Sequence, residues 1–303
     1  MSVSPWGCCA ALGIGLVAGA GQDSAKDPKP LACGSIERVY RLTPRLLCGS
    51  RPKRPEDFQT LARLGVQWIV SVDGIPPDVE AARAAGLRYI HIPLDYGSIS
   101  DDEASRLVRA VETAPGAVFL HCHHGKYRGP AASAIVAAAL EGWSDDRVAA
   151  WLAQAGLTPQ EYPDLYASAT TIVPPARATL DAIDPASLPE RSPVPDLVER
   201  MVEIDAIWEE LKEIKPGDIG DPALARQLGE QFREAARLDE SRRRGEELVS
   251  SLNAAARDAF AVEAAWRGRR SAVDHWDALR LSCVQCHRTF RNREVASPER
   301  EPD

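Results

Sequence analysis

The strongest constraint on the fold is a change of hydrophobic pattern across a proline-rich segment. Residues 173–196 hold six prolines, which are Pro174, Pro175, Pro185, Pro189, Pro193 and Pro195. Proline fixes φ and lacks a backbone N–H, so such a run disfavours helix and strand and favours a linker. With 303 residues the chain is long enough for two ordinary domains. We therefore expect one domain over 33–172, a linker over 173–195 and a second domain over 196–295.

Before this segment, short apolar runs alternate with helical patterns. The predicted strands are 66–72, 88–92 and 117–121, and the predicted helices are 55–64, 77–85 and 100–113. Strands that alternate with helices imply βαβ units and a mostly parallel sheet with flanking helices.

After the segment, the strand signal vanishes and four apolar stripes with helical spacing appear. They run from Leu197 to Leu211, Leu224 to Ala235, Leu248 to Phe260, and Val273 to Phe290. An Asp221-Pro222 pair marks the start of the second helix as a cap followed by a proline in its first turn. Four amphipathic helices in about 100 residues predict an all-α four-helix bundle.

Composition excludes several classes of protein. Hydrophobic residues make up 45% and charged residues 26%, which is inconsistent with a disordered chain, a collagen or a multi-span membrane protein. The net charge of -8 argues against a nucleic-acid partner. Seven cysteines are too few for a disulfide scaffold of this length.

The N-terminal segment is uncharged from Ser2 to Gln22, and its stretch 8–20 is small and apolar. It ends in Ala18-Gly19-Ala20, which fits the A-x-A rule of signal cleavage. We expect a signal peptide over 1–21 and no membrane span in the mature chain, because the apolar stretch is shorter than the roughly 20 residues a span needs. A flexible Gly/Ala tail is the alternative.

The first chemical motif, His121-Cys122-His123-His124-Gly125-Lys126-Tyr127-Arg128, has the form H-C-x5-R. It follows a predicted strand and precedes an Ala-rich predicted helix over 130–140. A loop over a helix N-terminus directs backbone N–H groups at a tetrahedral oxyanion. The helix end, with Arg128 and His121 nearby, is expected to lower the pKa of Cys122 and favour the thiolate.

This motif resembles the phosphate-binding loop of the protein tyrosine and dual-specificity phosphatases. The segment Leu46-Leu47-Cys48-Gly49-Ser50-Arg51-Pro52 also resembles the start of bacterial members, so the likeness covers about residues 36–170. It implies that Cys122 attacks phosphorus to form a phosphocysteine and that Arg128 clamps the phosphoryl oxygens. The phosphate-binding residues would be His123, His124, Gly125, Lys126, Tyr127 and Arg128.

The resemblance also requires a general acid on the loop before the third predicted helix. Asp95 is the first choice, although the family's aspartate aligns more naturally at Tyr96. Asp101 is the second choice, but its place in Ser100-Asp101-Asp102-Glu103 is typical of a helix N-terminus. Gly129 replaces the family's usual Ser or Thr, which helps the cysteine leave. Slow turnover, or anion binding without turnover, is therefore the alternative.

Two other interpretations of the loop remain open. His121, Cys122, His123 and His124 could be zinc ligands, but consecutive residues on a tight loop point in different directions, so a site would need distant partners. The other interpretation is a buried cysteine flanked by solvated histidines.

The second chemical motif, Cys283-Val284-Gln285-Cys286-His287, is the C-x-x-C-H signature of covalent haem attachment. Two thiols three residues apart on a helix can add to both haem vinyl groups, and the adjacent imidazole can reach the iron. A disulfide, a thioredoxin-like pair and a zinc half-site are the alternatives. A thioredoxin motif needs a βα unit, and a zinc site would find only His275 as a further ligand in this region.

C-x-x-C-H-x-x-F-R at the end of a predicted bundle resembles cytochrome c prime and its low-spin relatives over residues 195–295. The resemblance implies haem c attached at Cys283 and Cys286, His287 as axial iron ligand and Arg291 as a propionate partner. Low-spin relatives carry a methionine early in the first helix, which makes Met201 a possible second axial ligand. Because bacteria attach haem c outside the cytoplasm, we expect a periplasmic protein, in which Cys33 and Cys48 could pair.

The sequence therefore predicts an exported c-type haem protein fused to a cysteine-dependent phosphatase. Its partners would be a phosphorylated substrate or another oxyanion, and redox proteins that exchange electrons with the haem. The alternative is a weak or inactive phosphatase-like domain that binds an anion or partner, on a redox or gas-sensing cytochrome.

Overall fold

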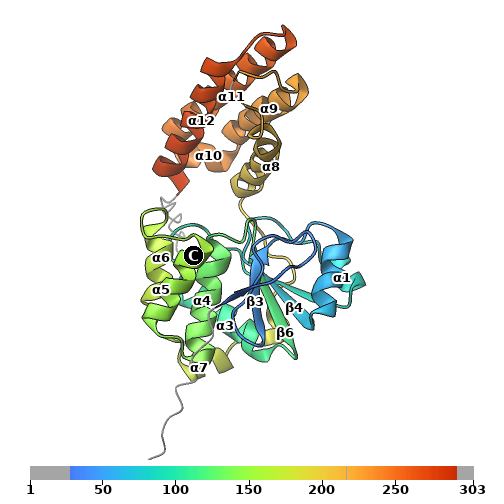
Figure 1. Ribbon diagram of the computed structural model, residues 1–303. Coiled ribbons are helices and arrows are strands. Elements are labelled where there is room, and N and C mark those ends of the chain that lie inside the picture. The colour runs from blue at the N-terminus through green and yellow to red at the C-terminus, as the bar shows by residue number, and fades with distance from the viewer. Residues whose placement is uncertain (1–27, 216, 292–303) are drawn as a thin grey trace, which may run out of the picture.

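The computed structural model describes residues 28–215 and 217–291, which form an α/β part and a helical part (Figure 1). The predicted signal peptide lies outside the described residues. No helix within the described ranges combines the length and the apolar character that a membrane span requires.

A six-stranded sheet forms the centre of the α/β part, with the strand order β1-β2-β3-β6-β4-β5. Strands β3, β6, β4 and β5 are parallel to one another, while β1 and β2 pair antiparallel at one side. Their bounds are Lys29–Pro30 (β1), Tyr40–Arg41 (β2), Leu46–Ser50 (β3), Val66–Ser71 (β4), Arg88–His91 (β5) and Ala117–Cys122 (β6). The mostly parallel sheet and the three predicted strands are confirmed; β1, β2 and β3 were not predicted as strands.

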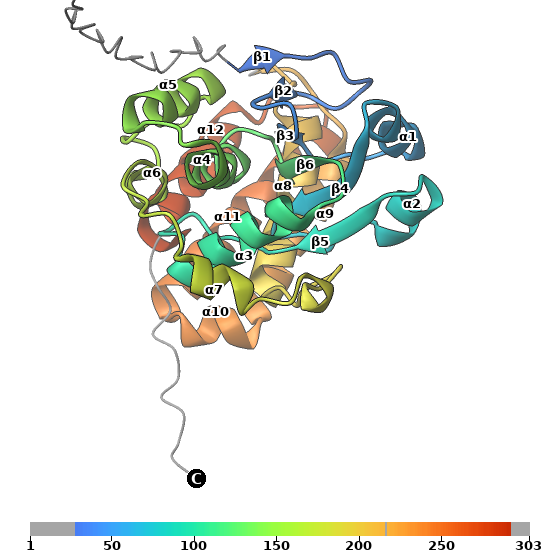
Figure 2. The same ribbon diagram turned by 90° about the horizontal axis from the view of Figure 1, so that it is seen from below.

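Helices cover both faces of this sheet (Figure 2). Helices α1 and α2 pack on one face with Phe58 and Val79, and α3 to α6 pack on the other. Their bounds are Pro55–Arg63 (α1), Val79–Ala84 (α2), Asp101–Thr113 (α3), Arg128–Glu141 (α4), Asp145–Ala155 (α5) and Pro163–Thr170 (α6). Every residue of α4 from Arg128 to Ala137 is buried, because its alanines allow close packing on all sides.

The proline-rich segment differs from the expected linker, because much of it is packed against the α/β part. It contains a short helix, α7 (Arg177–Asp181), and a 3-10 turn, η1 (Pro185–Ser187). Leu180 and Leu188 join the core on the α4 face of the sheet. The backbone N–H of His91 on β5 donates to the carbonyl of Pro189 at 2.8 Å. Prolines keep their carbonyl acceptors, so the segment can cover the edge of the sheet without forming a strand.

The helical part consists of four long helices with one shared core and a short fifth helix. The bounds are Asp196–Leu211 (α8), Pro222–Arg237 (α9), Asp239–Arg243 (α10), Glu246–Arg267 (α11) and Val273–Cys286 (α12), followed by a π-helical turn, His287–Arg291 (η2). The four apolar stripes are thus confirmed as helices, and the Asp221 side chain caps α9 by accepting from the N–H of Ala223 at 2.8 Å. The short α10 was not predicted.

The two parts meet where α8 begins and α12 ends (Figure 1). Asp205 of α8 and Arg291 of η2 both contact the α/β part, at the end of the sheet that carries the residues following β6.

Candidate functional site

The H-C-x5-R motif forms a loop between the end of β6 at Cys122 and the start of α4 at Arg128. Gly125 has φ +65°, and a Cβ built on it would lie 2.5 Å from the carbonyl carbon of Gly49. The position therefore requires glycine, both for its left-handed backbone and for the close approach to β3. The carbonyl of His123 accepts from the N–H of Arg51 at 3.1 Å, which fastens the loop to the segment after β3.

Cys122 lies at the base of this loop and is buried. Gly129 sits in the first turn of α4, and a Cβ built there would lie 3.4 Å from the Sγ of both Cys122 and Cys48. The same Cβ would lie 3.2 Å from the backbone N of Cys122, so Gly129 packs closely against the thiols at the position where the family would place a hydroxyl-bearing residue. Burial, together with the neighbouring Cys122, raises the pKa of the Cys48 thiol. Cys33 and Cys48 are both free thiols and belong to cores on opposite faces of the sheet, so their expected pairing is not formed.

The Arg128 side chain is buried and oriented by two acceptors. Its Nη1 donates to the carbonyl of Leu94 at 3.2 Å, and its Nη2 donates to Asp73 Oδ1 at 3.1 Å. Its Nε is buried and has no hydrogen-bond partner. A buried N–H without an acceptor is costly, so this group marks a place for an anion at the loop.

Asp73 is a site residue that the sequence reasoning missed. It follows β4 and is fully buried. One carboxylate oxygen accepts a hydrogen bond from Arg128, and the other lies 3.3 Å from His123 Nδ1. Burial alone would raise the pKa of Asp73, but the hydrogen bond from His123 and the charge of Arg128 hold it below its usual range. The available signal was an acidic residue directly after a predicted buried strand.

His121 corrects one expectation about the electrostatics of the loop. Its ring is fully buried, and the hydroxyl of Tyr89 lies 2.9 Å from Nε2. Burial lowers the pKa of His121 to about 4, so the ring is neutral near pH 7. The positive field at Cys122 must therefore come from the α4 N-terminus and Arg128 rather than from His121.

The expected general acid, Asp95, lies on an exposed loop. Its Oδ1 accepts from the N–H of Gly97 at 2.6 Å, which folds the carboxylate back onto its own loop. Asp101 occupies the first turn of α3 after the N-cap Ser100, as the helix-terminus interpretation predicted.

An aromatic rim surrounds the loop. The ring of Tyr96 lies 4.6 Å from the Arg128 guanidinium and 4.7 Å from the ring of Tyr162. Tyr127 completes the rim, with its ring 4.8 Å from Tyr162. The side chains of Lys126 and Tyr127 both contact Glu161.

The C-x-x-C-H motif lies at the lower end of α12 in Figure 1. Cys283 and Cys286 are free, half-buried thiols that pack against the helical core, as does Met201 of α8. The protein around His287 and the charge of Arg291 lower the pKa of His287 to about 4. A neutral imidazole is the form that binds a metal ion.

A cavity of about 760 Å³ adjoins Cys283 between α8 and α12. Its volume falls in the range typical of cofactor pockets. Its lining combines aromatic and aliphatic side chains with two cations and two anions, and the residues besides Cys283 are Trp208, Ile214, Trp276, Leu281, Val284, Lys212, Arg280, Glu213 and Asp277. Arg291 lies elsewhere: its guanidinium stacks 3.5 Å from the Tyr96 ring centre and donates to the Tyr162 hydroxyl at 2.9 Å.

Comparison with known proteins identifies the α/β part. Residues 38–168 match the family model "PTP-SAK: Swiss Army Knife protein, DSP-PTPase phosphatase domain". The α/β part is thus similar to phosphatase domains of the DSP-PTPase type. This agrees with the loop geometry, and the match ends before the helical part begins.

Two curated relatives are β-lactamase hydrolase-like proteins from Xylella fastidiosa strains 9a5c and Temecula1. They are 34% and 33% identical over 97 residues, covering 29% of this chain and 22% of each relative. The chain thus spans about a fifth of the length of these relatives.

Two solved structures are among those similar to this chain. TpbA of P. aeruginosa is 22% identical, with a TM-score of 0.44 over 50% of this chain and 93% of its own. A putative phosphatase (DUF442) of Shewanella putrefaciens CN-32 is 20% identical, with a TM-score of 0.38 over 45% of this chain and 91% of its own.

Proposed function

We propose that the N-terminal domain hydrolyses phosphomonoesters through a phosphocysteine intermediate at Cys122. The observation that carries this proposal is the buried Nε–H of Arg128, which has no acceptor beside the loop that holds Cys122. A phosphoryl oxygen would supply that acceptor. The match of residues 38–168 to a phosphatase family supports the same chemistry.

The proposed reaction has two displacements. The Cys122 thiolate attacks phosphorus, an S–P bond forms, and the ester P–O bond breaks as its oxygen takes a proton. Water then attacks phosphorus, the S–P bond breaks, and inorganic phosphate leaves as the thiolate returns. Arg128 and the loop N–H groups hold the equatorial oxygens in both steps. Asp95 is the proposed proton donor, which requires its carboxylate to turn away from Gly97.

Phosphate release by wild type and Cys122→Ser tests this proposal. Wild type should release phosphate from nitrophenyl phosphate and from a phosphotyrosine peptide, and Cys122→Ser should not. The serine variant should still bind inorganic phosphate, because Arg128 and the loop backbone are unchanged. Cys33→Ser is the matched control, since it removes a buried thiol on the other face of the sheet. Equal phosphate release by Cys122→Ser and wild type would refute the mechanism.

If wild type binds phosphate but does not turn over either substrate, that result would instead support the alternative function. The domain would then be an anion-binding or partner-binding module. The absence of a hydroxyl at Gly129 favours this outcome only if the second displacement is the slow step.

We also propose that the helical part binds haem c at Cys283 and Cys286, with His287 as an axial iron ligand. The observation that favours it is the cavity that adjoins Cys283, whose aromatic and aliphatic walls are joined by the cations Lys212 and Arg280 and the anions Glu213 and Asp277. A bound haem would supply one-electron transfer, with redox proteins as partners. In this chain His287 would hold one face of the iron and Met201 the other, while the cations would meet the propionates. Arg291 would have to leave the tyrosine rim to take the propionate role.

Expression with a haem-attachment system tests the second proposal. The absorbance of the haem should remain with the protein after acid–acetone extraction, and Cys283→Ala/Cys286→Ala should lose it. Met201→Leu should convert a low-spin ferric spectrum to high-spin. His275→Gln, which alters an exposed histidine on the helix of the two cysteines, α12, should not. Complete loss of colour from wild type on extraction would refute covalent attachment. Export to the periplasm is part of this proposal, because bacterial haem c is attached there.

A further inference from the structure

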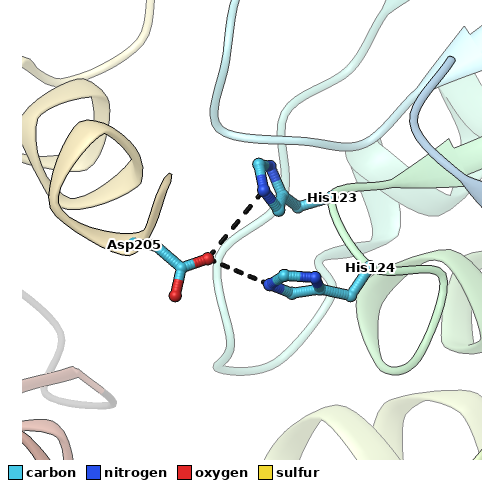
Figure 3. A group of neighbouring side chains, drawn as sticks. All are labelled: His123, His124 and Asp205. Carbon is cyan, nitrogen blue, oxygen red and sulfur yellow. Dashed lines mark hydrogen bonds and ion pairs between the residues drawn. The ribbon is translucent and has the colours of Figure 1, made fainter. Parts of the chain in front are cut away.

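We propose that His123, His124 and Asp205 bind one divalent metal ion of the zinc class where the two parts of the chain meet. Figure 3 shows the two imidazoles, from the loop after β6, directed at the carboxylate of α8. Each residue offers one ligand atom, and the three atoms lie within 4.8 Å of one another. This inference is independent of the two functions proposed above.

The distances fit an ion between the three groups. Asp205 Oδ2 lies 2.9 Å from His124 Nε2 and 3.9 Å from His123 Nε2. In a tetrahedral site with metal–ligand bonds of about 2.0–2.2 Å, ligand atoms are roughly 3.3 Å apart. The two observed distances bracket this value, so small side-chain rotations would complete the site.

The environment of His123 prepares it as a ligand. Its Nδ1 lies 3.3 Å from Oδ2 of the buried Asp73. In the neutral ring, Nδ1 carries the proton toward Asp73, and Nε2 keeps its lone pair. A carboxylate behind a histidine is the arrangement that orients most metal-bound histidines. The free lone pair then faces a carboxylate oxygen, and a cation between these two acceptors would satisfy both.

The donor set and its exposure indicate the kind of ion. Two imidazole nitrogens and one carboxylate oxygen favour zinc, cobalt or nickel over magnesium or calcium, which prefer oxygen ligands alone. The side chains of His124 and Asp205 are 43% and 40% exposed, whereas that of His123 is 9% exposed. An ion can therefore enter from solvent, and a water molecule can take a fourth position, as in open zinc sites.

Metal uptake by the full chain tests the proposal, with Zn²⁺ and Co²⁺ as probes. A chelator-stripped sample should bind one equivalent of Co²⁺, with visible d–d bands of a tetrahedral site, and Zn²⁺ should displace it. Cys283→Ser/Cys286→Ser serves as the background, because the motif thiols also bind these ions and would add sulfur charge-transfer bands. The d–d bands should survive in that background.

Variants then locate the site. Asp205→Asn and His124→Gln should each weaken Co²⁺ affinity at least tenfold, and both side chains are exposed enough for substitution without loss of folding. Asp258→Asn is the matched control, because Asp258 lies 4.0 Å from His275 in another His–Asp pair. It should leave Co²⁺ affinity unchanged.

Two results would overturn the proposal. One is the absence of Co²⁺ uptake in the Cys283→Ser/Cys286→Ser background, and the other is uptake that neither Asp205→Asn nor His124→Gln alters. Either would leave the cluster as a hydrogen-bonded contact between the two parts. The proposed metal ligands do not include Cys122. The metal test can therefore succeed even if the phosphatase assay finds no activity.

Discussion

At the residue scale, one buried carboxylate organises the loop. Asp73 holds the guanidinium of Arg128 with one oxygen and faces the imidazole of His123 with the other. The partners therefore depend on each other, because a buried ion that loses its counter-ion costs about 3–5 kcal/mol. Arg128, the proposed anion ligand, is thus also the partner that keeps Asp73 stable inside the protein.

His121 makes the stability of the α/β part depend on pH. Its pKa in the folded protein is about 4, below the ordinary value of a histidine near 6.5. As pH falls through 6.5, the unfolded chain binds a proton before the folded protein does, so stability present above pH 6.5 is lost toward pH 4. Between about pH 7 and pH 4.5, the unfolding free energy of wild type should decrease by roughly 2–3 kcal/mol more than that of His121→Gln.

Urea unfolding at the two pH values measures this difference. Glutamine can keep hydrogen bonds to Tyr89 and to the carbonyl of Cys122, so the variant isolates the titration. His275→Gln, at an exposed position, should behave as wild type. An identical pH dependence in His121→Gln and wild type would show that His121 titrates normally.

At the element scale, the loop and α4 are shaped by glycines with similar backbones and different surroundings. Gly125 and Gly142 have φ +65° and +67°, but a Cβ would meet the backbone of Gly49 at the first position and nothing within 4 Å at the second. An alanine at either position would have a strained backbone, but only an alanine at Gly125 would also collide with β3.

Gly125→Ala should therefore destabilise the protein by about 3 kcal/mol or more, and Gly142→Ala by only about 1–2 kcal/mol. Gly125→Ala should also lose phosphate binding, because the loop must move away from β3. Urea unfolding and phosphate titration of both variants provide the measurements. Equal losses of stability would mean that the loop yields easily at Gly125.

At the scale of the whole molecule, the helical part covers the loop-bearing end of the sheet (Figure 1). Asp205 reaches His124 from α8, and Arg291 reaches Tyr96 and Tyr162 from η2. The aromatic rim beside the loop is therefore also a contact surface between the two parts.

Removal of the Arg291 guanidinium should loosen this contact. Its cation–π interaction contributes about 0.5–2 kcal/mol, and the hydrogen bond to Tyr162 adds to it. We expect Arg291→Ala to increase the radius of gyration in small-angle X-ray scattering and to speed hydrolysis of bulky phosphopeptides more than of nitrophenyl phosphate. Arg288→Ala, on an exposed position of the same turn, should change neither. Unchanged scattering in Arg291→Ala would show that other contacts fix the arrangement.

Much of the fold could be predicted from local patterns. Strands β4, β5 and β6 and the long helices carry strong periodicity, and their order implies the parallel sheet. The two-residue strands β1 and β2 are too short for any period. The segment after α4 was given no elements, although Ser144 caps α5 and Gly156 ends it, which are ordinary start and stop signals.

The site was predictable only where its residues are contiguous. Cys122 and Arg128 lie within one motif, so spacing and strand–loop–helix context identified them. Asp73, Tyr162 and Asp205 come from segments that are distant in the sequence, and only the fold brings them to the loop. Haem attachment at Cys283 and Cys286 stays a prediction from the sequence.

The proline-rich segment also bears on aggregation. Strand β5 lies at the open side of the sheet, where unpaired backbone groups can recruit strands of other chains. Pro189 accepts from the N–H of His91, and Ser192 donates its hydroxyl to the carbonyl of the same residue. Because Pro189 has no N–H to offer to a further strand, the segment is a poor template for continued β-pairing. The same residues that join the two parts therefore keep the sheet from growing into its neighbours in solution.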